Sequence, residues 1–133
     1  MRTVRVAAAI ICDGNKVLAA QRGYGDYKDG WEFPGGKLEP DESADTACVR
    51  EIAEELHVLI GNLEYLCTVE YDYENFHLSM DCFVCAIIDG EIDDSEHEAL
   101  RWLDVRELHD VDWLPADREV VAALEGRLDV AGV

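Results

Sequence analysis

The sequence predicts an α+β fold in which one mixed β-sheet is covered by helices on both faces. Apolar runs typical of strands alternate with two amphipathic helical segments, in the order strands, helix, strands, helix. The chain has 133 residues, of which 49% are hydrophobic, which is enough to form the core of one domain. We therefore expect residues 1–133 to form a single domain.

Turn residues separate the elements of the N-terminal third. Two apolar runs flank Asp13-Gly14, a dipeptide that favours a tight turn and so predicts a β-hairpin. A loop rich in glycine and aspartate follows over residues 23–30. "WEF" at residues 31–33 is expected to be a short strand that ends in a turn at Pro34-Gly35-Gly36.

The rest of the chain holds two helices and three strands. Ser43 is a suitable N-cap for a helix that runs to about Leu56. Strands are expected over residues 63–73 and 76–88, with a turn near Glu74-Asn75, and "ALRWLDVREL" predicts a short strand followed by a helical turn. Apolar residues at helical spacing predict a terminal helix over residues 115–128.

The composition excludes several classes of partner. A net charge of −19 argues against binding a nucleic-acid polymer, which needs clustered lysine and arginine, but it permits a small phosphorylated substrate if divalent cations screen the site. No apolar run approaches the roughly 20 residues of a membrane span. The run from Val4 to Cys12 is too short for a signal peptide, so we expect a cytoplasmic protein.

The cysteines favour a reducing compartment, because five of them form no regular framework and most lie in apolar stretches. Cys82 and Cys85 have the CxxC spacing of many zinc sites. They lie in a predicted strand, where residues three apart point to opposite faces, so we expect them to be free thiols rather than zinc ligands.

Acidic residues are concentrated on the first predicted helix. On a helical wheel, Glu51, Glu54 and Glu55 fall within a wedge of about 100°, opposite an apolar face. That face consists of Val49, Ile52, Ala53 and Leu56, while Ala44 and Ala47 lie on the glutamate side and leave room for a ligand. Carboxylate oxygens suit hard divalent cations, but composition and spacing leave a metal site and a solvated acidic face equally open.

A resemblance to a known family favours the metal site. "GKLEPDESADTACVREIAEELHV" at residues 36–58 resembles the Nudix box, G-x5-E-x7-R-E-U-x-E-E-x-G-U with U aliphatic. The one departure is His57, where the motif has a glycine that ends the helix, so the geometry of the helix exit is in question. The resemblance implies the Nudix fold, an α/β/α sandwich with a mixed sheet.

Other segments extend the resemblance over nearly the whole chain. "WEFPGGK" resembles the MutT-type branch, which hydrolyses nucleoside triphosphates. "LAAQR", "GGKLEPDES", "EHEALRW" and "LPAD" look similar to the branch that acts on CTP and 5-methyl-dCTP. The implied activity is hydrolysis of a nucleoside triphosphate to the monophosphate and pyrophosphate, with Mg²⁺ or alternatively Mn²⁺ as cofactor and a pyrimidine nucleotide favoured as substrate.

The resemblance also implies a role for individual residues. The metal would be bound by Glu51, Glu54, Glu55, Glu96 and the Gly35 carbonyl. Arg50 would orient the glutamates, and Glu42 would support the same cluster without contacting the metal. Lys37 and Arg22 match positions near the phosphates, and Phe33 and Asp117 match positions that line the base pocket. Glu51 is expected to accept the proton of the attacking water, with Glu96 as the alternative.

Simpler explanations stay open for four of these residues. Asp117 could serve only as the N-cap of the last helix, Phe33 could be core packing, and Lys37 and Glu96 could be solvated charges. At the level of function, the alternatives are an 8-oxo-dGTP diphosphatase, a pyrophosphatase of ADP-ribose or a related nucleotide, and a non-catalytic module that binds a nucleotide. We expect the protein to be a monomer or a homodimer.

Overall fold

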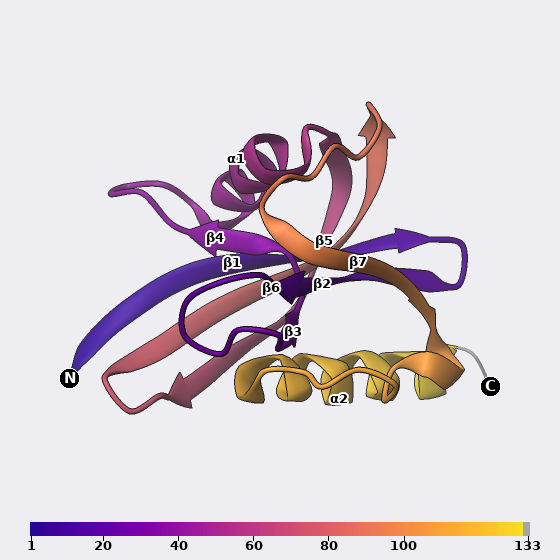
Figure 1. Cartoon of the computed structure of the whole chain (residues 1–133). Coiled ribbons are helices and arrows are strands. Elements are labelled where there is room, and N and C mark those ends of the chain that lie inside the picture. Colours follow the sequence, from indigo (N-terminus) through magenta and orange to yellow (C-terminus); the bar gives the residue numbers. More distant parts are fainter. Residues whose placement is uncertain (132–133) are drawn as a thin grey trace.

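Two helices lie on opposite faces of a mixed β-sheet, which confirms the predicted architecture (Figure 1). The computed structural model describes the backbone of residues 1–131 and the side chains of residues 1–127. The helices are α1 (Ala44–Leu56) and α2 (Pro115–Ala131), and a short 3₁₀ helix spans Val105–Glu107. The strands are β1 (Arg2–Asp13), β2 (Lys16–Arg22), β3 (Trp31–Glu32), β4 (Gly35–Lys37), β5 (Leu59–Asp72), β6 (Phe76–Asp89) and β7 (His97–Asp104).

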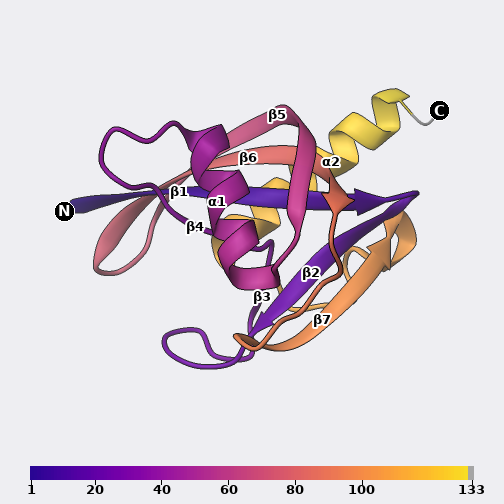
Figure 2. The same ribbon diagram turned by 90° about the horizontal axis from the view of Figure 1, so that it is seen from above.

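The central strand of the sheet is β1, and in the view from above α1 crosses in front of this strand while α2 lies behind the sheet (Figure 2). The strand order is β3-β2-β1-β6-β5, while β4 pairs with β1 and β7 pairs with β2. Strands β1 and β6 are parallel, and the other strand pairs are antiparallel. Ala7, Ala8, Ala9, Ile10 and Ile11 are at most 2% exposed, as expected of a strand covered on both faces.

The segment Gly35-Gly36 is a strand, so the predicted turn at this position is wrong. Gly35 pairs with Ala8 and Gly36 pairs with Ala7, which makes β4 a short antiparallel partner of β1. A Cβ atom at Gly35 would overlap the Ala7 carbonyl oxygen, and one at Gly36 would overlap the Glu51 carboxylate. The two glycines therefore allow close approach of neighbouring groups on both faces of β4.

Two hydrophobic cores fill the space between the sheet and the helices. One lies under α2 and includes Ile10, Leu103 and Val120, and the other lies under α1 and includes Ile11, Ile52 and Leu56. Cys82 belongs to the first core and Cys85 to the second, which confirms that the two thiols point to opposite faces. All five cysteines are free thiols.

Helix α1 is rotated relative to the prediction. Its buried residues are Ala47, Cys48, Ile52 and Leu56, whereas Ala53 is exposed. The predicted apolar face is confirmed for Ile52 and Leu56, and Val49 packs against the same core, but it is wrong for Ala53. Ala47 is core rather than a space for a ligand. The packing of α1 against the glycines of β4 brings Glu51 and Glu55 toward the interior and leaves Glu54 exposed. This rotation gives the three glutamates different environments.

The exit of α1 keeps the geometry of the motif even though glycine is absent. His57 has φ 59° and ψ 33°, a left-handed conformation, and its backbone N–H donates to the Ala53 carbonyl over 3.2 Å. A residue with a Cβ atom adopts this conformation at a cost of roughly 1–2 kcal/mol. His57 therefore preserves the helix exit at some expense of stability.

The two helix starts also differ from the simplest prediction. Ser43 occupies the N-cap of α1, but its hydroxyl pairs with Thr46 rather than with a backbone N–H. Asp117 lies inside α2, whose first residue is Pro115, so it is not an N-cap. Neither of the two helices is long and apolar enough over the described residues to cross a membrane.

Candidate active site

Arg50 organises the carboxylates of the Nudix-like segment. Its Nε and Nη2 donate to the two oxygens of Glu42, both over 2.8 Å, and its Nη1 donates to Glu51 over 2.8 Å and Glu54 over 3.2 Å. Nη2 also donates to the Lys37 carbonyl over 3.0 Å, which ties the helix to β4. These bonds lower the pKa of Glu42 to about 2, chiefly through the hydrogen bond from Arg50. The predicted orienting role of Arg50 is consistent with this network.

Glu55 carries the most perturbed carboxylate of the group. Its Oε2 is buried and has no hydrogen-bond partner among the described residues. Burial raises the pKa of Glu55 to about 8, and the nearby charges of Glu51, Glu96, Glu32 and Asp94 add to the effect. A buried carboxylate among like charges needs either a proton or a cation.

The donor set around Glu55 fits a hard divalent cation. Oxygen ligands with excess negative charge suit Mg²⁺, and the unpartnered Oε2 offers a ligand that no described protein group satisfies. Over the residues whose side chains are described, no three acidic, histidine or cysteine groups are already gathered around one ion position. The carboxylates of Glu51 and Glu54 are paired with the guanidinium of Arg50.

The loop before β7 brings a second acidic segment to this region. Glu96 is exposed, but its charge acts on Glu55, so the loop carries it toward the helix. Asp94, which no sequence motif singled out, accepts hydrogen bonds from the backbone N–H groups of Glu96 over 3.0 Å and His97 over 3.2 Å. The Asp94 carboxylate is 7% exposed, so these hydrogen bonds hold the loop from its buried side.

A cavity of about 310 Å³ is lined in part by the three residues of β4, and one of them, Gly36, lies against the Glu51 carboxylate. Its volume is at the lower end of the range for small-molecule sites, roughly 300–1,000 Å³. The four residues predicted to bind substrate all line it: Arg22, Phe33, Lys37 and Asp117. Further lining residues that the sequence did not point to include Glu32, Tyr73, Phe76 and Tyr27.

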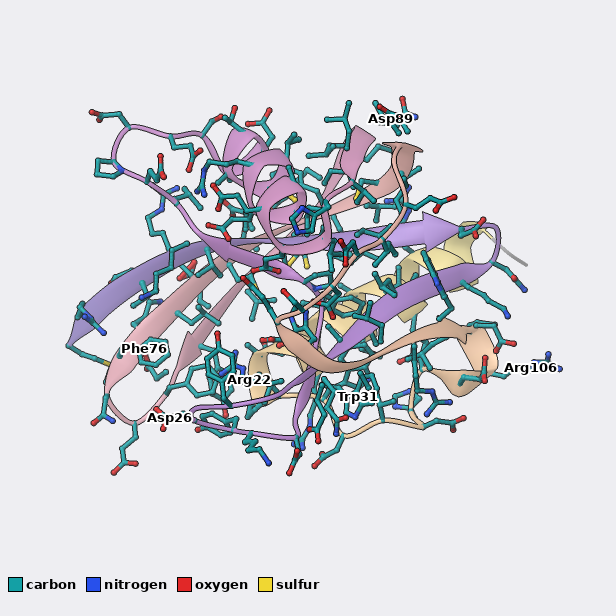
Figure 3. All side chains as sticks on the ribbon, turned by 45° about the horizontal axis from the view of Figure 1, so that its top comes forward. Arg22, Asp26, Trp31, Phe76, Asp89 and Arg106 are labelled. Carbon is teal, nitrogen blue, oxygen red and sulfur yellow. The ribbon has the colours of Figure 1, made fainter. Side chains whose placement is uncertain are left out.

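Arg22 and Glu32 form an ion pair at the cavity wall. The Arg22 Nη2 donates to Glu32 Oε1 over 2.6 Å, and Nη1 donates to the Asp26 carbonyl over 3.0 Å. Figure 3 shows Arg22 beside the loop that carries Asp26. Glu32 lines the cavity, and its charge raises the pKa of both Glu55 and Asp117, so it lies near both carboxyl groups. The segment "WEFPGGK" contains Glu32, but only the fold shows that it faces both.

Asp117 is a buried carboxyl group at the cavity. Its side chain is 5% exposed, and its Oδ1 accepts a hydrogen bond from the Phe33 backbone N–H over 2.9 Å. Burial raises the pKa of Asp117 to about 8 even though the Phe33 N–H and Arg22 act in the opposite direction. Burial therefore favours the protonated form of Asp117, which can donate as well as accept.

Aromatic side chains provide much of the cavity wall. The Phe33 ring is 4% exposed and stacks on Trp113 with the ring centroids 4.5 Å apart, so it serves core packing as well as lining the cavity. Tyr73 stacks on Phe76 and meets Tyr27 edge to face. The Tyr73 hydroxyl accepts from the Ala116 backbone N–H over 3.2 Å, which anchors the start of α2 to the cavity.

Comparisons with known proteins identify the family. The model of the NUDIX domain matches residues 1–124. A Mycobacterium tuberculosis protein provisionally named 8-oxo-dGTP diphosphatase 2 is 38% identical over 93% of this chain and 89% of its own length. The CTP pyrophosphohydrolase of Escherichia coli is 35% identical over 92% of both chains.

Solved structures agree on the fold. The solution structure of the E. coli ORF135 protein has a TM-score of 0.80 and 34% sequence identity, and the match covers 98% of this chain and 94% of that one. The MutT Nudix hydrolase of Burkholderia pseudomallei has a TM-score of 0.79 and 25% identity over 94% of this chain and 98% of that one. The chain therefore belongs to the Nudix family, as a MutT-like nucleotide pyrophosphohydrolase.

Proposed function

We propose that the protein hydrolyses cytosine nucleoside triphosphates, such as CTP, dCTP or 5-methyl-dCTP, to the monophosphate and pyrophosphate with Mg²⁺ as cofactor. The observation that carries this proposal is the buried Asp117 at the wall of the 310 Å³ cavity. A protonated carboxyl group presents one donor and one acceptor. The Watson–Crick edge of cytosine presents the complementary pair, the N3 acceptor and the N4 amino donor.

The same carboxyl group is less suited to guanine. The Watson–Crick edge of guanine presents two adjacent donors, N1–H and N2–H₂, which an ionised carboxylate accepts better than a protonated one. An 8-oxo-dGTP diphosphatase is the second candidate, because the M. tuberculosis relative carries that name and is 38% identical. The protonation state of Asp117 under assay conditions thus separates the two candidates.

The remaining alternatives have less support. All glutamates of the box are present, which argues against a non-catalytic module. A Nudix domain that binds ADP-ribose shares the fold with a TM-score of 0.78, but at 20% identity this likeness concerns the fold alone. The E. coli relative named for CTP, with 35% identity over nearly the full length, favours the triphosphate.

The residues of the site would have three roles: binding the metal, binding the phosphates and positioning the metal ligands. Glu51, Glu54, Glu55, Glu96 and the Gly35 carbonyl would hold the metal, which supplies charge neutralisation and a more acidic water. Arg50 would position Glu51 and Glu54, and Glu42 would in turn hold Arg50. Lys37 and Arg22 would face the phosphates, because both are cations that line the cavity.

Glu51 is the proposed proton acceptor for the attacking water, with Glu96 as the alternative. The hydrogen bond from Arg50 and the close contact with Gly36 fix the Glu51 carboxylate in place. We expect Glu51→Gln to lower kcat by about 10²-fold or more while the fold is kept. A fully active variant would exclude Glu51 from this role.

A substrate panel with product identification tests the proposal. CTP, 5-methyl-dCTP, 8-oxo-dGTP, dGTP and ADP-ribose are incubated with Mg²⁺, and release of pyrophosphate is distinguished from release of sugar phosphates. Asp117→Asn imitates the protonated carboxyl group, so it should keep the preference for cytosine, whereas Asp117→Ala should lose it. A preference for 8-oxo-dGTP that Asp117→Asn abolishes would contradict the proposal and favour the second candidate.

A further inference from the structure

Two cysteines face each other across the antiparallel strands β5 and β6. Cys67 and Cys82 are direct partners in the register of this pair. Facing residues of antiparallel strands have Cα atoms roughly 4.5–5.5 Å apart, which lies within the range of about 4.4–6.8 Å found in disulfides. Cys82 is part of the core under α2 and Cys67 packs against the same core, so both sulfur atoms lie on one face of the sheet.

The register and the shared core place the two thiols side by side. Their mutual influence lowers the pKa of Cys67 and raises the pKa of Cys82, whose S–H donates to the Met80 carbonyl over 3.7 Å. Cys67 is half-buried, whereas Cys82 is fully buried at 0% exposure. Solvent therefore reaches the sulfur that is more readily ionised, and its partner stands directly behind it.

The other three cysteines lack this arrangement. Burial raises the pKa of Cys48 to about 12 and also raises the pKa of Cys85 and Cys12. Cys48 and Cys85 are at most 3% exposed, so an oxidant in solution does not reach them. Within the described residues, Cys67 and Cys82 are the cysteines that face each other in a strand register, and one of the two is partly exposed.

We propose that Cys67 and Cys82 form a modification site at which hydrogen peroxide generates a reversible disulfide between β5 and β6. The Cys67 sulfur attacks one peroxide oxygen, the O–O bond breaks, and the released hydroxide takes a proton to leave as water. This step yields a Cys67 sulfenic acid. The Cys82 sulfur then attacks the Cys67 sulfur, the S–O bond breaks, and hydroxide leaves with the Cys82 proton as a second water. Overall, two thiols and one peroxide become one disulfide and two waters.

The disulfide would lie beside the cavity. Met80, which lines the cavity, precedes Cys82 by two residues on the same face of β6, and the charge of Asp117 acts on the Cys82 thiol. The bond would close the chain segment between residues 67 and 82, so it would fix β5 against β6 next to a bulge in their register. The site is independent of which nucleotide the enzyme prefers.

Mapping of thiols after oxidation tests the site. The full-length protein is treated with hydrogen peroxide, its remaining thiols are alkylated, and the peptides are identified by mass. We expect loss of two of the five free thiols, a disulfide-linked pair of peptides containing Cys67 and Cys82, and reversal by dithiothreitol. The melting temperature should rise by roughly 5–10 °C under non-reducing conditions, because the bond restricts the unfolded chain.

Variants keep the experiment decisive. Cys67→Ser should abolish the disulfide, and Cys82→Ala should leave Cys67 as a sulfenic acid that dimedone traps. Cys48→Ser serves as the matched control and should form the disulfide like the original protein. Any other pairing, a disulfide only between two chains, or conversion of Cys67 to the sulfinic acid without a linked peptide would overturn the proposal.

Discussion

Replacement of Gly36 by alanine should separate catalysis from folding. A Cβ atom at this position would overlap the Glu51 carboxylate and stand 2.8 Å from Glu51 Cγ. The carboxylate is the end of a flexible side chain, so it can move away by roughly 1 Å at little cost in stability, and a displacement of that size at a catalytic group reduces the rate by roughly 10²-fold.

The assay combines steady-state hydrolysis of the preferred triphosphate with thermal unfolding. We expect Gly36→Ala to lower kcat by about 10²-fold and the free energy of unfolding by less than about 1 kcal/mol. The hydrogen bond from Arg50 to Glu51, now 2.8 Å, should be weakened in the same variant. A variant that retains more than half of the original activity would refute the reasoning.

Two other glycines provide matched controls. A Cβ atom at Gly35 would overlap the Ala7 carbonyl oxygen and stand 2.9 Å from Ala8 Cα, so β4 would have to move away from β1. Gly35→Ala should therefore cost about 1–3 kcal/mol of stability. A Cβ atom at Gly126 in α2 would meet no described atom within 4 Å, and Gly126→Ala should stabilise the protein by up to about 1 kcal/mol. If Gly36→Ala were as destabilising as Gly35→Ala, the contact with Glu51 would not be the reason.

Three further predictions concern the helix α1. The pKa of Glu55 is raised to about 8, so the folded metal-free protein keeps a proton that the unfolded chain releases near pH 4.5. The free energy of unfolding should therefore fall as pH rises between these two values. Thermal unfolding in the presence of a chelator measures this pH profile, and Glu55→Gln should flatten it. Arg50→Lys keeps the positive charge but loses the guanidinium hydrogen bonds to Glu42, Glu51 and Glu54. Calorimetry should show that Mg²⁺ binds about 10–100-fold more weakly while the fold stays intact. His57→Gly puts a residue without a Cβ atom in the left-handed conformation and should raise the free energy of unfolding by about 1 kcal/mol, measured by chemical denaturation. No gain in stability would show that other contacts of His57 compensate for the strain.

Much of the site could be predicted because the Nudix box is a local pattern. Glu51, Glu54, Glu55 and Arg50 lie on one helix, and their spacing alone brings them within reach of one another. Arg22, Phe33, Lys37 and Asp117 were found through the resemblance, and the fold brings all four to one cavity. Hydrophobic periodicity also predicted the terminal helix, and the Asp13-Gly14 dipeptide between two apolar runs predicted the hairpin of β1 and β2.

The rotation of α1 could not be predicted from the helix itself. The helical wheel placed Ala53 on the apolar face and Ala47 on the glutamate side, but the helix exposes Ala53 and buries Ala47 and Cys48. The choice depends on β4, whose glycines admit the side chain of Glu51 between helix and strand. Since Gly35-Gly36 was expected to be a turn, this contact lay outside the reach of sequence reasoning.

The sequence by itself determined the family, the order of the elements and the carboxylates of the box, because these depend on residue types at fixed spacing along the chain. Only the tertiary structure decided how those carboxylates differ. Glu42 is held by Arg50, Glu54 is exposed, and Glu55 has a buried oxygen without a partner among the described residues. The same holds for Asp117, whose position in α2 is local but whose burial beside the Phe33 N–H comes from a residue far away in the chain. Burial and the pairing of charges arise from contacts between distant segments, and so they appear only once the chain is folded.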